Sequence, residues 1–407
     1  MSVATQDTPE VDAPAPAGEP PVVSILIPCL NEQVVIGEFV DWCWEGLAKA
    51  GVSGEVVIVD SSSDRSPDIA EARGARVVRV PKRGLGRAYI DGIPHCRGKY
   101  VIMGDCDLTY DFRDLGPFVK KLDAGYEFVM GTRMKGSIDP GAMPPLHQYF
   151  GTPVTTWMLN RIYRTPFSDM HCGMRACTTA ALKRMDLQSQ SWQYASEMII
   201  KAVQMGFRNT EVPIHFLKDR EGRESHLKRT GWWAPWFAAW ITLRAMFTFG
   251  ADYFLYKPGL VMLTLGLLLV LPLSTGPIVI GPLGLSLHWM LAGMTLAALG
   301  LQCVFMGIVA RVLYDYTGHQ TERWMAVFEY DRAMIAATAL AGLGVLATVP
   351  LIAVYVREGF ALPPELGRPN YLAVTGLLSI IAAFLTFATT LLVHAVVAVK
   401  QRRNVQA

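Results

Sequence analysis

Two carboxylates, Asp105 and Asp107, stand one residue apart in the stretch MGDCDLTYDF, which follows the apolar run GKYVI. Acids spaced Asp-x-Asp at the end of a strand can both reach one divalent cation, and hard oxygen ligands suit Mg²⁺ or Mn²⁺. Such a cation would neutralise the diphosphate of a nucleotide. Acidic turns are common, however, so a solvated loop is the simpler explanation of the triplet taken alone.

Three further polar loops follow apolar, β-branched runs. Carboxylates in such loops can accept hydrogen bonds from ribose hydroxyls or a base imide, and serines can donate. The first two loops, in ILIPCLNE and VIVDSSSD, supply the candidate ligands Pro28, Asn31, Glu32, Asp60, Ser62 and Asp64. In the third, PKRGLGRAYIDG, Gly84 and Gly86 permit close backbone approach beside basic residues. A plain turn or cap would explain any one of these loops.

The elements that carry these loops predict a mixed α/β domain over residues 22–229. Short β-branched runs alternate with polar helical stretches up to about Phe216, which is typical of a Rossmann-like, mostly parallel sheet. Ligands of open α/β sheets bind beyond the carboxyl ends of the strands. The chemistry is therefore expected in the loops at that edge.

The second half of the chain predicts a membrane domain. The chain is 51% hydrophobic, and no Asp, Glu, Lys or Arg occurs between Lys257 and Arg311. A bilayer span takes about 20 apolar residues, so this stretch accommodates two helices with a turn near STGPIVIGPLG. Two more uncharged stretches, 333–356 and 369–399, complete four transmembrane helices within 258–399. Buried core helices of a soluble domain are the alternative.

The flanking segments predict how the protein meets the membrane. The tryptophan-rich segment 230–257 is expected to form one or two helices on the membrane surface, or else a plain core helix. Basic residues follow the second and fourth spans, so the α/β domain and the tail 400–407 are expected in the cytoplasm, with the protein integral to the cell membrane. Residues 1–21, rich in Pro and Ala, are expected to be a disordered tail rather than a secretory signal. The net charge of +2, without a basic stripe, argues against a nucleic-acid partner.

A set of motifs gives the chain a family resemblance. In this order, P-x-x-N-E, V-D-S-x-S-D, G-L-G-x-A-Y, D-x-D-L and G-T-R resemble a family 2 glycosyltransferase with a GT-A fold. More closely, they resemble the dolichol-phosphate mannose synthase branch, the polyprenyl-phosphate glycosyltransferases. The segments SDMHCGMR, EVPIHF and DREGRESHL extend the likeness through residue 227, more than half of the chain.

The resemblance implies roles for the acids of the first loops. Asp60 and Asp64 would hold the base and ribose of a nucleotide diphosphate sugar. Asp105 would lie by the ribose or diphosphate, where it is also a candidate metal ligand. Asp107 would ligate the metal.

The resemblance also implies phosphate-binding roles for basic residues. Arg133 of GTR would bind the acceptor phosphate, with Arg175 of GMR supporting that region. Arg220 and Ser225 would close over the phosphates, Arg220 on the donor side and Ser225 on the acceptor side. Arginine suits these roles because its fork matches phosphate oxygens bidentately.

Four positions leave the site less certain from sequence alone. Many relatives carry a second acceptor arginine and a serine where this chain has Gln148 and Thr152, which makes that phosphate cradle weaker. Asp169 precedes the GMR segment, and Glu197 stands where other family 2 enzymes keep an acid. Each of these two acids is either a catalytic group or a structurally paired one.

Together these features predict an inverting, metal-dependent transfer of a hexose from a nucleotide diphosphate sugar to a polyprenyl phosphate, of the dolichyl or undecaprenyl type, at the cytoplasmic membrane face. A lipid monophosphate has a second pKa near 6, so it is already an oxyanion at neutral pH and needs no general base. The sequence leaves the sugar, the prenol and the oligomeric state open, homo-oligomers included.

Two other functions compete with this one. HQTERWM contains Gln320, Arg323 and Trp324 in the Q-x-x-R-W spacing of processive polysaccharide synthases, although here two spans separate it from the catalytic core. We interpret it instead as a cytoplasmic loop with a tryptophan anchor. The third hypothesis is a non-catalytic membrane scaffold on a transferase fold, against which the intact Asp105, Asp107 and Arg133 argue.

Overall fold

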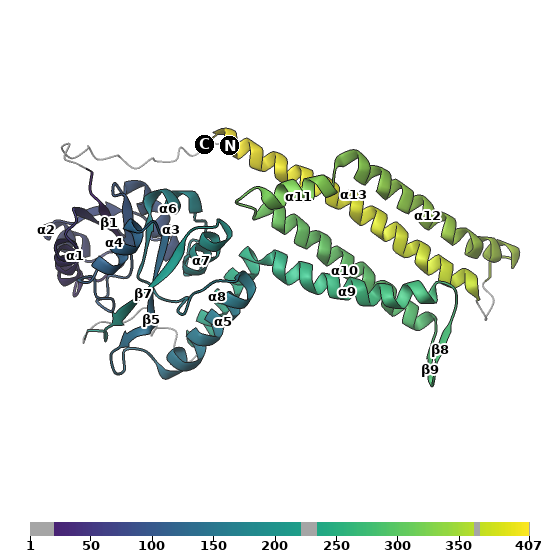
Figure 1. Cartoon of the computed structure of the whole chain (residues 1–407), viewed down its shortest axis with the longest axis horizontal. Coiled ribbons are helices and arrows are strands. Elements are labelled where there is room, and N and C mark those ends of the chain that lie inside the picture. The colour runs from purple at the N-terminus through teal and green to yellow at the C-terminus, as the bar shows by residue number, and fades with distance from the viewer. Residues whose placement is uncertain (1–19, 221–233, 362–366, 407) are drawn as a thin grey trace. The chain divides into compact units, whose positions relative to one another are not determined.

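The computed structural model describes residues 20–220, 234–361 and 367–406 (Figure 1). Within these residues the chain divides into two compact units. The first holds residues 20–144, 172–192 and 208–220, and the second holds the rest. Segments 145–171 and 193–207, which sequence reasoning placed in the catalytic domain 22–229, thus cluster with the apolar helices that follow.

A seven-stranded sheet forms the centre of the first unit, with strand order β3-β2-β1-β4-β6-β5-β7. Its strands are β1 (Val23–Cys29), β2 (Gly54–Asp60), β3 (Arg76–Arg79), β4 (Tyr100–Met103), β5 (Phe128–Ile138), β6 (Arg175–Thr178) and β7 (Asn209–Phe216). β6 runs antiparallel to β4 and β5, whereas the other described pairings are parallel. The predicted mostly parallel sheet is therefore confirmed.

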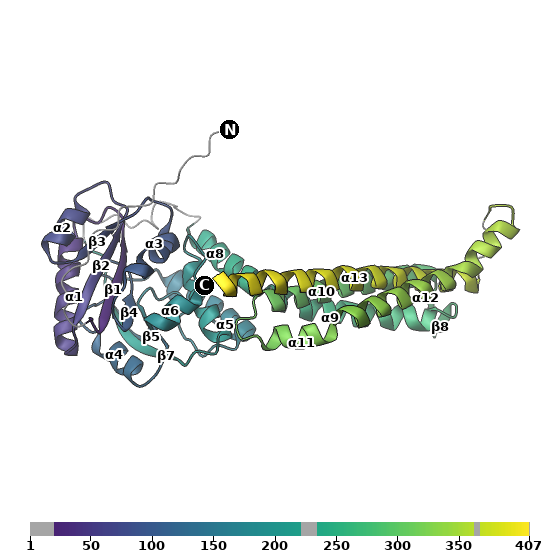
Figure 2. The same cartoon turned by 90° about the horizontal axis from the view of Figure 1, so that it is seen from above.

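Helices cover this sheet, because its central strands are apolar on both faces. They are α1 (Ile36–Ala50), α2 (Ser66–Ala72), α3 (Leu85–Gly92), the 3₁₀ turn Ile93–His95, α4 (Gly116–Asp123) and α6 (Thr179–Met185). α1 packs against both α2 and α4, and α3 packs against β1 and β2. Figure 2 shows the strands edge-on between these helices.

The second unit is helical apart from one hairpin. It contains a π-helical turn (His147–Gly151), α5 (Thr152–Tyr163), α7 (Tyr194–Gln204), α8 (Ala234–Phe249), α9 (Ala251–Leu273), α10 (Leu287–Leu313), α11 (His319–Val327), α12 (Tyr330–Arg357) and α13 (Arg368–Gln406). The turn expected near STGPIVIGPLG is a β-hairpin of β8 (Ile278–Ile280) and β9 (Leu283–Leu285). α5, α7 and α8 contact one another.

Four helices of this unit are long and apolar enough to cross a membrane. They are Ala251–Leu273, Leu287–Leu313, Tyr330–Arg357 and Arg368–Arg402. The predicted number of spans is confirmed, but the first begins at Ala251 rather than at 258, because the helix break falls at Gly250. The predicted surface segment 230–257 is thus divided between α8 and the start of α9.

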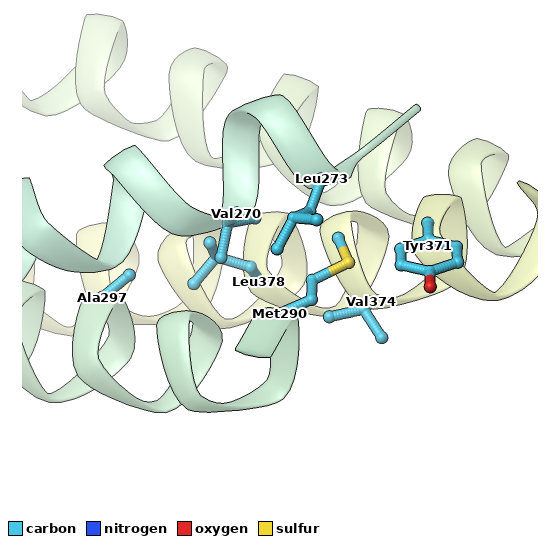
Figure 3. Packing of buried hydrophobic residues seen from close by; sticks show 7 residues of the cluster. All are labelled: Val270, Leu273, Met290, Ala297, Tyr371, Val374 and Leu378. Carbon is cyan, nitrogen blue, oxygen red and sulfur yellow. The ribbon is translucent and has the colours of Figure 1, made fainter. Parts of the chain in front are cut away.

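Apolar side chains and glycines hold these helices together. Val270 and Leu273 of α9, Met290 of α10 and Val374 of α13 share one buried cluster (Figure 3). Trp324 of α11 is also buried, in a second cluster with residues of α10 and α13, so it is not the surface anchor that its sequence suggested.

Glycines spaced seven residues apart let α9 and α10 approach closely. They are Gly259 and Gly266 on α9, and Gly293, Gly300 and Gly307 on α10. A Cβ at Gly300 would collide with the backbone of Leu263, and one at Gly266 would collide with the backbone of Ala297. This small-residue interface is typical of helix packing in membranes.

We expect Gly300→Leu to destabilise the detergent-solubilised protein. Overpacking of a filled interface costs roughly 1–3 kcal/mol, occasionally more, so the unfolding temperature should fall by several degrees in a thermal melt. Gly342→Leu on α12 is the matched control, because nothing lies within 4 Å of a Cβ at that position. Equal melting of both variants would contradict the assigned packing of α9 on α10.

Candidate active site

The sheet of the first unit has a topological switch point, where the strand order reverses. The chain runs from β1 outward through β2 and β3 and then returns to β4 on the other side of β1. Ligands of open α/β sheets bind at such a point, beyond the carboxyl ends of the strands. There the Cys106 thiol donates to the Pro28 carbonyl at 3.5 Å, which joins the loop after β4 to the end of β1.

The loops after β1 and β2 hold each other by hydrogen bonds. The Asn31 N–H donates to Ser62 Oγ at 2.7 Å, and the Ser63 N–H donates to Asn31 Oδ1 at 2.9 Å. Asn31 adopts a left-handed backbone with φ 56°, which asparagine tolerates well. The Glu32 N–H donates to Ser66 Oγ at 2.9 Å. Of the predicted ligands, Asn31, Glu32 and Ser62 thus shape the loops through their own hydrogen bonds.

The two acids after β2 differ in their surroundings. Asp64 Oδ1 accepts from the Ser66 N–H at 2.9 Å, and its Oδ2 accepts from the Gln33 N–H at 3.3 Å. Asp60 is 2% exposed, and its Oδ2 accepts from the Ser62 N–H at 3.2 Å. Its buried Oδ1 has no hydrogen-bond partner among the described residues. Because buried polar atoms are normally satisfied, Asp60 is poised to accept from a bound ligand.

The paired acids that follow β4 are half-buried. Asp107 Oδ1 accepts from the backbone N–H and the hydroxyl of Thr109, at 3.1 and 2.6 Å, across a turn in which Leu108 has φ 61°. Asp105 lies against Gly173, where a Cβ would stand 2.5 Å from its Oδ2. Glycine at 173 therefore leaves the space that the Asp105 carboxylate occupies.

Tyr110 connects the acids to Arg133. Its hydroxyl accepts from the Gly173 N–H at 2.7 Å, and its ring packs edge-on against Phe216, with centroids 5.2 Å apart. The guanidinium of Arg133, 8% exposed, lies 5.1 Å from the same Phe216 ring. Burial raises the pKa of Tyr110 well above its ordinary value, and the nearby Asp105 charge raises it further, whereas Arg133 lowers it. A neutral tyrosine therefore stands close to both charged groups.

The glycines after β3 lie against another loop of the first unit. A Cβ at Gly84 or Gly86 would collide with the backbone carbonyls of Gln190 or Ser189. The backbone at these glycines therefore lies close to the chain's own loop 189–191. The Gln190 carbonyl of this loop also accepts a hydrogen bond from the Arg87 N–H at 3.0 Å. This contact accounts for both glycines without a ligand.

Arg175 and Arg220 contact protein groups. Arg175 is fully buried and donates to the Cys172 carbonyl at 2.6 Å, so it supports the loop before β6 from inside the fold. Arg220 is paired with Glu38 on α1 and lies 6.0 Å from the Trp42 ring. Its predicted closure over the donor phosphates stays a prediction, and Ser225 lies outside the described residues.

Four predicted residues belong to the second unit, Glu197 among them. Gln148 is half-buried in the π-helical turn, and Thr152 is buried at the start of α5. Asp169 is fully buried and accepts from the His171 N–H at 3.1 Å. Its carboxylate orders the loop that follows α5.

Glu197 forms a buried ion pair. Its carboxylate lies 2.6 Å from Lys201 Nζ, one turn along α7, and both side chains are at most 1% exposed. Lys201 Nζ in turn lies 5.8 Å from the Phe249 ring of α8 and 5.7 Å from the Tyr316 ring after α10. Of the two roles open for Glu197, this geometry favours structural pairing.

Comparison with known proteins identifies the family. Residues 24–189 match the family model described as glycosyl transferase family 2, and residues 309–397 match its C-terminal transmembrane region. The low-salt glycan biosynthesis hexosyltransferase Agl6 of Haloferax volcanii is 34% identical over 296 residues, 72% of this chain and 70% of that protein. The chain belongs to glycosyltransferase family 2.

Other family 2 relatives are also similar to this chain. The dolichyl-phosphate hexose transferase of Haloferax volcanii is 28% identical over 203 residues, 49% of this chain and 84% of that protein. Among solved structures, glucosyl-3-phosphoglycerate synthase from Mycobacterium tuberculosis, in complex with Mn²⁺, UDP and phosphoglyceric acid, is 20% identical. That match has a TM-score of 0.43 and covers 55% of this chain and 78% of that one. The predicted GT-A fold followed by membrane helices is confirmed, and the protein is an integral membrane glycosyltransferase.

The acidic pair could hold a divalent metal together with the substrate. In the described part of the chain, no group of three or more His, Cys, Asp or Glu side chains could form a metal site by itself. Asp105 and Asp107 provide two half-buried carboxylates, one of them in the space left by Gly173. Mg²⁺ is usually held by one or two carboxylates together with substrate phosphates and water, so this pair suffices.

Sequence reasoning missed two residues of the site, Tyr110 and Gly173. Tyr110 lies within MGDCDLTYDF, but nothing in its spacing indicates that its hydroxyl meets a loop 63 residues away. The available signal was that Gly173 is itself the glycine of the GMR motif.

We expect Glu197→Gln to destabilise this family 2 enzyme, because it removes the carboxylate that lies 2.6 Å from the buried Lys201 ammonium. Breaking a buried pair costs about 3–5 kcal/mol, and the double variant Glu197→Gln with Lys201→Met should regain most of that loss in thermal unfolding. The double variant should also transfer sugar. A double variant that is stable but inactive would show that Glu197 is a catalytic group instead.

Proposed function

We propose that the protein transfers a hexose from a nucleotide diphosphate sugar to a polyprenyl phosphate, with inversion at the anomeric carbon. The phosphate oxygen of the lipid forms the new bond to this carbon as the bond to the diphosphate breaks. The single observation that carries the proposal is the position of Arg133, a nearly buried cation joined through Phe216 and Tyr110 to the acidic pair after β4. An anion-binding arginine beside a carboxylate pair suits an acceptor that is itself an anion.

The donor side is supported by Asp60. Its buried Oδ1, unpartnered within the described residues, can accept from a base imide or a ribose hydroxyl. Asp64 keeps the adjoining loop in shape through Ser66. Together they suit the nucleoside end of the donor.

Asp105 and Asp107 are the residues that would hold Mg²⁺ or Mn²⁺. Such an ion, when bound, neutralises the charge of the leaving diphosphate. The chain's own contribution is to fix both carboxylates, through the Thr109 hydrogen bonds and the Gly173 contact. Orientation of this kind supplies much of the rate in phosphate and glycosyl chemistry.

A lipid phosphate is a suitable acceptor because it can attack without a general base. A lipid monophosphate is ionised at neutral pH, and the buried Glu197 is already paired with Lys201. The four apolar helices suit a prenol substrate that never leaves the bilayer. The similarity to a protein named dolichyl-phosphate hexose transferase agrees with such an acceptor.

The proposed enzyme faces the cytoplasm. Arg323 lies between the second and third spans, Arg332 lies in the first turn of the third, and Lys400 and Arg402 lie at the end of the fourth. An excess of basic residues in these places is typical of cytoplasmic segments.

The competing functions find less support. For a processive synthase, the Q-x-x-R-W segment would have to face a polymer, but Trp324 is buried among residues of α10 and α13. A scaffold would have no use for the buried Asp60 Oδ1, which lacks a hydrogen-bond partner among the described residues.

The proposal predicts that Asp107→Asn abolishes formation of a labelled lipid. The protein, in membranes with Mg²⁺ or Mn²⁺, is given radiolabelled UDP-glucose, GDP-mannose or UDP-N-acetyl sugars with undecaprenyl or dolichyl phosphate. One donor should yield a chloroform-soluble product with one sugar per lipid phosphate. Loss of an electrostatic group that acts in the transition state costs on the order of 10²–10³-fold in rate.

Asp114→Asn is the control, because Asp114 is an exposed acid seven residues further on. It should retain the wild-type rate, and both variants should insert into the membrane normally. A long polymer as product would favour the synthase instead, and no product from any donor would overturn the proposal.

A further inference from the structure

The segment 146–157 exposes large apolar side chains where a surface helix normally exposes polar ones. The large apolar residues of this segment face outward: Tyr149 is 75% exposed, Phe150 61% and Trp157 65%. Leu146 and Val154 are exposed on the same side. A helix that packs on a protein core normally turns its apolar stripe inward, so this aromatic face lacks a partner within the described residues.

The opposite side of α5 is small and polar. Thr152, Thr155 and Thr156 are buried there. Thr155 Oγ1 lies 2.9 Å from His171 Nε2, and the Met170 N–H donates to Thr156 Oγ1 at 3.2 Å. The hydroxyls of Thr155 and Thr156 thus have hydrogen-bond partners inside the second unit. These bonds fix the rotation of α5 about its axis, so its aromatic face remains outward.

The end of α5 is fixed to the start of the first span. The Tyr163 hydroxyl donates to the Met246 carbonyl of α8 at 2.8 Å, and Gly250 lies against the same hydroxyl. The first candidate span begins at the next residue, Ala251. Burial raises the pKa of Tyr163, so the tyrosine remains a neutral donor at this junction.

The composition of the outward face suits a bilayer surface. Tyr and Trp favour the headgroup region, and exposed Arg161 and Arg164 at the far end of α5 can meet anionic lipids. The 17 residues from His147 to Tyr163 are too few for a span, which needs about 20. They are sufficient for a helix that lies in the plane of the interface.

We propose that the aromatic face formed by Leu146, Tyr149, Phe150, Val154 and Trp157 is embedded in the cytoplasmic interface of the lipid bilayer. α5 is then an additional membrane-contacting helix, separate in sequence from the tryptophan-rich segment 230–257. Since Gln148 lies on the same segment, this docking would bring a residue expected to bind the acceptor to the level of the lipid phosphates. The docking itself does not depend on the catalytic proposal.

Spin labels on the full-length protein in phosphatidylcholine–phosphatidylglycerol nanodiscs test this docking. Phe150→Cys and Trp157→Cys are labelled singly, and collision rates with O₂ and with a water-soluble Ni²⁺ chelate are measured by EPR. Six of the seven native cysteines are buried, and the signal of the unsubstituted protein gives the background. Should either substitution prevent folding, Val154→Cys on the same face gives the same readout.

Two matched positions calibrate the measurement. Leu268, 65% exposed on the first span, is the lipid reference, and Val34, 69% exposed before α1, is the water reference. Labels at 150 and 157 should give an O₂-to-nickel ratio several-fold above that of Val34 and close to that of Leu268. A ratio equal to that of Val34 would overturn the proposal, as would protection from both reagents, which would indicate a second copy of the chain.

Discussion

The hydrogen bond from the Gly173 N–H to the Tyr110 hydroxyl, 2.7 Å long, is the contact on which the active site depends. It ties the loop after β4, which carries both acids, to the loop before β6. The Tyr110 ring then meets Phe216 at the end of β7, and the same ring supports Arg133 of β5. Because burial keeps this tyrosine neutral, it positions the carboxylates and the arginine without adding a charge of its own.

Sequence reasoning could find the acids of the site but not the contacts that orient them. Asp60 and Asp107 follow buried strands, and the ends of parallel strands meet at one edge, so their placement follows from the pattern. The Tyr110–Gly173 bond joins positions far apart in the chain, and no periodicity reveals it. For Gly84 and Gly86 the structure adds a contact that the sequence did not indicate, because both glycines admit the 189–191 loop; their predicted role beside a ligand stays a prediction.

The membrane half was predictable for a simple reason. A long apolar stretch without charged residues is compatible with few structures besides a transmembrane helix, so the number of spans followed from composition. The error was in the start of the first span, which follows Gly250. The division of the first half was not predictable. α5 carries threonines where a soluble helix would carry leucines, and α7 buries Glu197 with Lys201, so neither pattern indicates that these helices cluster with the apolar ones.

We propose that Asp107, held by Thr109, is a ligand of the metal that accompanies the donor diphosphate. The most direct test is a Mn²⁺ titration of the detergent-solubilised protein with UDP or GDP, in which EPR measures the free aqueous ion. We expect the wild-type protein and Asp114→Asn to remove Mn²⁺ from solution in the presence of one of these nucleotides, and Asp107→Asn to leave it in solution. Equal Mn²⁺ binding by Asp107→Asn and the wild-type protein would contradict it.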